Sequence, residues 1–145
     1  MRRSIIALLG ATLALAGATA APAATKARCG AGSVKGIAWV TGGSKGVGTL
    51  TGTWTSAGSL FGYRWNCSGG TVSVRKPDVE PQGFDVKFAG NPGRIAIANA
   101  AGSPAAASVS RNADGSFHVA LAGTVNATGG GFALRSDLAF IVIVF

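Results

Sequence analysis

The feature that most constrains this fold is an alternation of apolar and polar residues, interrupted by glycine-rich turns. The alternation is clear at residues 47–54, 60–67 and 84–89. Successive side chains of a strand point to opposite faces of a sheet, so a period of two predicts β-strands rather than helices. Short turns between such strands favour antiparallel pairing. We therefore predict an all-β fold, a single antiparallel β-sandwich of about nine or ten short strands.

The same pattern places the remaining strands and one turn. Asn112-Ala113-Asp114-Gly115 is typical of a type I hairpin turn with glycine in the left-handed position. The alanine-rich segment 100–107 consists of small residues and is expected to be flexible. The other expected strands cover residues 34–41, 71–75, 94–98, 108–111, 116–122, 132–135 and 138–145.

The N-terminus has the pattern of a secretory signal peptide. Arg2 and Arg3 precede an apolar stretch over residues 5–16, and small residues suited to cleavage after Ala20 or Ala23 follow. A membrane span needs roughly 20 apolar residues, so this stretch is too short, and no second one approaches that length. We expect a secreted or cell-envelope-associated protein without a transmembrane segment in its mature chain.

This reading divides the chain into three parts. We expect a signal peptide over residues 1–20, a short flexible N-terminal segment over residues 21–28, and one β-sandwich domain over residues 29–145. The chain contains 2 Cys, Cys29 and Cys67, and an exported protein can oxidise them. We predict a structural disulfide between them, worth roughly 4 kcal/mol because it closes a long loop of the unfolded chain.

Aromatic residues concentrate in the first half of the chain. Alternation along residues 60–67 puts Phe61, Tyr63, Trp65 and Cys67 on one face, which we expect to be the core, with Arg64 and Asn66 facing outward. Trp39, beside Lys35 and Thr41, is expected to be exposed, and the position of Trp54 stays open.

Two further patterns concern the second half. Residues 84–90 and 117–123 are similar, which indicates a duplicated hairpin, and residues 139–145 are apolar on both faces. A strand without a polar face is expected either at the centre of a sheet, covered on both sides, or at an edge that must be protected. Together, the two similar segments and the apolar closing strand resemble those of small secreted bacterial β-modules. This resemblance implies no particular activity.

The sequence offers few groups for catalysis. The chain has 1 His, His118, which we expect on the solvent face of a strand. A G-x-S-x-G match, Gly42-Gly43-Ser44-Lys45-Gly46, falls in a glycine-rich stretch that we expect to be a hairpin loop, and no helix is expected after it. Asp78 and Glu80 share one proline-flanked loop and are the residues that a small hydrolase would use, a low-ranked alternative. We expect no enzyme activity, no metal site and no cofactor.

Charge suggests the kind of partner. The formal net charge is +8, but the basic residues are scattered, and an exported protein rarely meets nucleic acid. An anionic envelope polymer or glycan is the more plausible partner. The first hypothesis is a non-catalytic binding or structural module, and the alternative is a carbohydrate-binding module in which exposed Trp39 and Trp54 stack on sugar rings.

Overall fold

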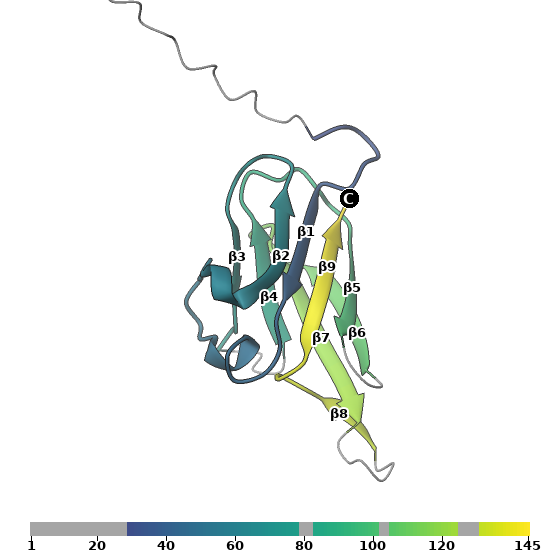
Figure 1. The fold of residues 1–145 in the computed structure, drawn as a ribbon. Helices are drawn as coiled ribbons and strands as arrows, with labels where there is room; N and C mark the ends of the chain where they lie inside the picture. Colours follow the sequence, from purple (N-terminus) through teal and green to yellow (C-terminus); the bar gives the residue numbers. More distant parts are fainter. Residues whose placement is uncertain (1–28, 79–82, 102–104, 125–130) are drawn as a thin grey trace, which may run out of the picture.

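The computed structural model describes residues 29–78, 83–101, 105–124 and 131–145. The expected signal peptide (1–20) and N-terminal segment (21–28) lie outside the described residues, as does Glu80. The described residues form two antiparallel sheets packed face to face, so the predicted all-β sandwich is confirmed (Figure 1). No helix among them is long and apolar enough to span a membrane.

Sheet A has the strand order β2-β1-β9-β5. Its strands are β2 (Phe61–Asn66), β1 (Gly36–Val40), β9 (Ala139–Val144) and β5 (Ala96–Ala101). The closing strand β9 lies in the centre, paired on one side with β1 and on the other with β5. Of the two positions expected for an apolar strand, the centre of a sheet is therefore the correct one and the edge is not.

Sheet B has the order β3-β4-β7-β6, and β8 also pairs with β7. Its strands are β3 (Val72–Arg75), β4 (Gly83–Phe88), β7 (Phe117–Thr124), β6 (Ala105–Arg111) and β8 (Phe132–Leu134). The two similar segments of the sequence form β4 and β7, which are neighbours in this sheet. The expected hairpin turn joins β6 to β7, with Gly115 at φ 81° and its N–H donating to the Asn112 carbonyl.

The core lies between the two sheets and is built from alternate residues of each strand. Phe140, Val142 and Val144 of β9 are fully buried. Phe140 stacks on Phe84 of β4, with ring centroids 5.3 Å apart and ring planes inclined by 17°. Offset stacking of this kind adds to the free energy gained from apolar burial, and it joins the centre of sheet A to sheet B.

Two expectations about local structure are wrong. Residues 47–54 form no strand, because the glycine-rich segment before them hydrogen-bonds to itself: Val47 N–H donates to the Thr41 carbonyl and Gly48 N–H to the Gly43 carbonyl, both at 2.9 Å. A 3₁₀ turn, Val47–Thr49, follows. Conversely, most of the supposedly flexible segment 100–107 belongs to strands, because β5 continues to Ala101 and β6 starts at Ala105.

The predicted disulfide between Cys29 and Cys67 is present, with Cα atoms 5.2 Å apart. Cys67 directly follows β2 and is buried. Its backbone N–H donates to the Lys35 carbonyl at 2.9 Å. The disulfide therefore fastens the first described residue of the chain to the end of an edge strand.

Candidate functional site: the outer face of sheet A

The two tryptophans proposed as ligand contacts lie at different sheets, Trp39 in a strand of sheet A and Trp54 outside any strand but against sheet B. Trp39 projects from the outer face of sheet A and is 43% exposed, as expected. Trp54 lies against Arg75 and Lys87, which extend from the outer face of sheet B, at 4.6 Å and 5.7 Å from its ring centroid. Both cations cover the indole of Trp54, so the two tryptophans do not form one surface.

The expectation that Tyr63 and Trp65 are core residues is wrong. The register between β1 and β2 shifts by one residue, because Trp39 is opposite Tyr63 whereas Val40 is opposite Phe61. A bulge of this kind reverses which face each later side chain occupies. Tyr63 and Trp65 are accordingly 53% and 40% exposed.

The same shift moves Asn66 inward, against the prediction that it faces solvent. Asn66 is opposite Gly36 and buried. Its side-chain amide donates to the carbonyls of Gly70 and Ala89, at 3.0 Å and 2.9 Å, and its oxygen accepts from Asn91. Because its hydrogen bonds are made internally, Asn66 can be buried without an unsatisfied polar group. Phe61 and Cys67 do face the core side, as predicted.

The bulge residue Gly62 positions the Trp39 ring. A Cβ atom on Gly62 would lie 2.7 Å from Cε3, 2.8 Å from Cδ2 and 3.1 Å from Cζ3 of Trp39. Three adjacent ring carbons at nearly equal distance mean that the indole lies over the glycine with its face rather than its edge. The opposite face of the indole is then turned toward solvent, so the sheet presents a flat aromatic surface.

Three aromatic rings share this surface. Trp39 and Tyr63 are directly opposite one another on β1 and β2, and Trp65 is opposite Ile37 in the next row. We call Trp39, Tyr63 and Trp65 the aromatic platform. Directly opposed residues lie about 4.5–5.5 Å apart at Cβ, and successive residues on the same face of a strand about 7 Å apart. The three rings therefore form one contiguous platform.

Isoleucines continue the platform across the sheet. Ile37 is opposite Ile143 of β9, and Ile143 is opposite Ile97 of β5; in the next row Ile141 lies between Trp39 and Asn99. In Figure 1 no described element crosses in front of the middle strands of sheet A. The closing strand is thus central but covered on its inner face only, which corrects the expectation that a central position would cover both faces.

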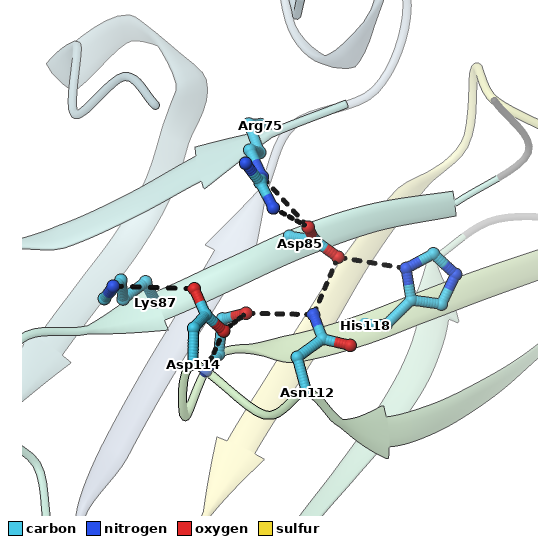
Figure 2. A network of polar contacts seen from close by, with 7 residues as sticks. Arg75, Asp85, Lys87, Asn112, Asp114 and His118 are labelled. Atoms are coloured by element: carbon cyan, nitrogen blue, oxygen red, sulfur yellow. Dashed lines mark hydrogen bonds and ion pairs between the residues drawn. The ribbon is translucent and has the colours of Figure 1, made fainter. Parts of the chain in front are cut away.

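The outer face of sheet B carries a polar network instead (Figure 2). Asp85 of β4 is 3% exposed, and its carboxylate accepts from Arg75 Nε at 2.9 Å and from Asn112 Nδ2 at 3.1 Å. His118 Nδ1 lies 3.0 Å from the same carboxylate. A buried carboxylate is tolerated when charged and polar partners satisfy both oxygens, and these partners come from β3, β7 and the β6–β7 turn.

This network corrects the expectation that His118 faces solvent. Asp85 and His118 occupy matching positions of the duplicated hairpin and are directly opposite one another on β4 and β7. The His118 side chain is only 14% exposed. Its contact with Asp85 makes it part of a network that joins three strands, and the alternation of residues alone could not reveal that pairing.

A second carboxylate lies beside this network. Asp114 accepts from the Ser116 hydroxyl at 2.5 Å and the Ser116 N–H at 3.0 Å, and Lys87 Nζ lies 3.5 Å away. The Ser116 hydrogen bonds, assisted by the charge of Lys87, lower the pKa of Asp114 below its ordinary value. These contacts stabilise the turn between β6 and β7.

The structure describes only one of the two low-ranked hydrolase candidates. Asp78 is exposed and lies close to Gly52, where a Cβ would be 2.5 Å from Oδ2, while its partner Glu80 lies outside the described residues. Within the described part of the chain no three His, Cys, Asp or Glu side chains are grouped to hold a metal ion.

Comparison with family models, with curated proteins and with solved structures found no match to this chain. The geometry of the two outer faces is therefore the basis on which a function can be inferred.

Proposed function

We propose that this chain is a non-catalytic, exported binding module that holds a polysaccharide on the aromatic platform. One ring face of a sugar presents polarised C–H groups, and these pack against the electron-rich face of an aromatic ring. The observation that carries the proposal is the position of Trp39, which lies flat on Gly62, is 43% exposed and is directly opposite Tyr63.

The shape of the surface favours an extended ligand. Side chains of a single sheet form the platform, and it continues into the isoleucine rows of β9 and β5. Strands lie about 4.8 Å apart, so four strands span about 14 Å, which is longer than one sugar ring. A polymer that lies across the sheet makes several such contacts at once.

A second candidate is a protein partner, and a specific observation favours it. Ile37, Ile97, Ile141 and Ile143 supply aliphatic rather than aromatic area on the same face. Contiguous apolar patches on a protein surface commonly mark interaction sites. A protein partner would use these isoleucines as much as the rings, whereas a sugar would depend on the rings, so the two candidates differ in the variants that weaken binding.

Export is part of the proposal and is supported by the apolar stretch near the N-terminus and by the disulfide between Cys29 and Cys67. Expression in a secreting bacterial host tests it. A protein recovered outside the cytoplasm with Ala21 or Ala24 as its first residue supports export, and an uncleaved protein in the cytoplasm contradicts it.

Affinity electrophoresis tests the ligand. The wild-type protein, Trp39→Ala and Trp54→Ala are run in gels containing soluble β-glucan, xylan, a soluble chitin derivative or a polyuronate. We expect at least one polymer to retard the wild-type protein. Trp39→Ala should weaken that interaction at least tenfold, because aromatic residues at the centre of a binding surface contribute most of its energy.

Trp54→Ala is the matched control. It removes a partly buried indole that is covered by Arg75 and Lys87 on the other sheet, so it should leave affinity unchanged. Urea unfolding of all three proteins shows whether lost affinity merely reflects lost structure. Retardation by none of the polymers, or equal weakening by both variants, would overturn the proposal. A protein captured through Ile97 and Ile143, with Trp39→Ala harmless, would favour the second candidate.

A further inference from the structure

An open groove lies at one edge of the sandwich, where the chain crosses from β2 in sheet A to β3 in sheet B. Its volume is about 360 Å³, and it is lined by residues 64–66 of β2, by residues 69–71 of the connecting turn and by Val72. Trp65 of the aromatic platform is one of the lining residues. The groove is therefore continuous with the surface on which we propose that sugars stack.

Arg64 is the one charged residue among those that line this groove. It is opposite buried Ala38, so it extends from the side of β2 that faces sheet B, at the open edge of the sandwich. No ion pair joins it to a carboxylate in the described part of the chain. The remaining lining residues are neutral, so an anion entering the groove would meet no opposing charge from its walls.

The guanidinium of Arg64 is held in place without being neutralised. Its Nη1 donates to the Ser56 carbonyl at 2.5 Å, and its Cζ lies 5.0 Å from the centroid of the Phe61 ring. Stacking on an aromatic ring fixes the plane of a guanidinium, and a fixed plane loses less conformational entropy when it binds a ligand. Only one of its five N–H donors is used by that hydrogen bond.

We propose that Arg64 binds the carboxylate of an acidic sugar whose ring, or whose neighbour along the polymer, stacks on the aromatic platform. The ligand class is then a polysaccharide that contains uronic acid. A guanidinium pairs with a carboxylate through two parallel N–H···O bonds, which gives orientation as well as energy. This inference rests on the proposed function and adds the charge of the ligand to it.

Two forms of one polymer separate the charge from the sugar. A soluble polyuronate and the same polymer with its carboxyl groups reduced to alcohols share their ring shape and linkage but differ in charge. We expect the wild-type protein to bind the polyuronate about tenfold more tightly than the reduced polymer, since a hydrogen bond between two charged groups is stronger than one to a neutral hydroxyl. Arg64→Gln should abolish this preference and leave binding of the reduced polymer unchanged.

Arg111→Gln is the matched control, because Arg111 is an exposed arginine in a different groove, between β5 and β6. It removes the same charge from the protein and should leave the preference intact. Arg64→Lys, which keeps the charge but not the paired N–H donors, should retain only part of the preference for the polyuronate. The comparison is made at low and at physiological salt, because non-specific attraction is screened.

The outcomes distinguish the inference from the function on which it rests. Equal binding of both polymers by the wild-type protein, or a preference that Arg64→Gln leaves unchanged, overturns the role of Arg64 while sugar binding stands. If Arg111→Gln loses the preference for the polyuronate as much as Arg64→Gln does, the preference comes from the overall charge of the protein. That result also overturns the role of Arg64. Binding of neither polymer, together with none of the neutral ones, overturns the proposed function itself.

Discussion

Gly62 determines the character of the outer face of sheet A. It occupies the bulge at which the pairing of β1 and β2 slips by one residue, and the slip turns Tyr63 and Trp65 outward. It also leaves the space in which the Trp39 ring lies. Any side chain at this position would have to displace the Trp39 indole. Adding a single methyl group at residue 62 therefore tests this role directly.

We expect Gly62→Ala to weaken polysaccharide binding nearly as much as Trp39→Ala. The new methyl group would lie 2.7 Å from the indole, closer than real contacts allow, so the ring must lift from the sheet. Gly58→Ala is the control, because a Cβ there meets nothing within 4 Å. Affinity electrophoresis of both variants checks this, and equal affinities for the two would refute the role of Gly62.

Asp114 predicts a pH dependence of stability. Hydrogen bonds from Ser116 and the charge of Lys87 lower its pKa in the folded protein below the value of 3.8 expected when unfolded. The unfolded state therefore binds the proton more readily, and the stabilisation is present above pH about 3.8 and is lost as the pH falls through the folded pKa.

Asp114→Asn should consequently unfold at lower urea concentration than the wild-type protein at pH about 5, and the difference should shrink toward pH about 2.5. Asp137, whose pKa is lowered by Arg135, is present in both proteins, so its titration cancels in the comparison. A difference that stays constant or grows in acid would show that Asp114 does not act through its charge.

At the scale of elements, the alternation of residues predicted most strands but not the faces of every strand. Alternation identified β4 and β7, where no residue interrupts the period and the inward residues Phe84, Val86, Phe117 and Val119 are buried. It failed along β2, because a bulge inserts a residue without any signal beyond a glycine. It failed again over residues 47–54, where hydrogen bonds within the preceding glycine-rich segment prevent strand pairing.

The candidate site shows the same limit. The exposure of Trp39 followed from its polar neighbours. The separation of Trp39 from Trp54 depends on which sheet each indole lies against, and local sequence carries no information on that. Tyr63 and Trp65 were missed because aromatic residues beside a cysteine usually fill a core. The glycine between Phe61 and Tyr63 was the one available signal, since glycine in a strand often marks a bulge.

The two faces of β9 provide a prediction at this scale. Val142 is fully buried between the sheets, whereas Ile143 lies in the isoleucine rows of the outer face. Val142→Thr should lower the free energy of unfolding by about 1–3 kcal/mol, because it buries a hydroxyl without a partner. Ile143→Thr, the same kind of change one residue later, should lower it by less than about 1 kcal/mol.

Urea unfolding of the two β9 variants measures both values. Equal losses would mean that the outer face of sheet A is covered in solution, and an apolar partner, such as a second copy of the chain, would then have to be sought. A larger loss of stability in Val142→Thr than in Ile143→Thr, as predicted, would mean that the outer face of sheet A is open to a ligand.

At the scale of the whole molecule, the sandwich has one apolar interior and two outer faces of opposite character. The outer face of sheet B is polar and internally paired around Asp85. The outer face of sheet A exposes aromatic and aliphatic side chains. Because a strand such as β9 without a polar face favours aggregation when exposed, we infer that the apolar outer face is kept for binding.

The disulfide gives the prediction that belongs to this scale. Replacing Cys29 and Cys67 together by serine should lower the free energy of unfolding by about 4 kcal/mol, since the crosslink closes a loop with a sequence separation of 38. The slope of the urea transition should rise because the unfolded chain becomes less compact. A double variant as stable as the wild-type protein would mean that the disulfide contributes little to the fold.

The three tryptophans allow one measurement that tests the central claim most directly. Each indole N–H gives its own NMR signal, which single Trp→Phe variants assign, and the signals can be followed while an oligosaccharide of the retained polymer is added. Our account predicts saturable shifts of the Trp39 and Trp65 signals, which come from the aromatic platform, and an unchanged Trp54 signal from the other sheet. Shifts of the Trp54 signal with Trp39 and Trp65 unchanged would contradict it.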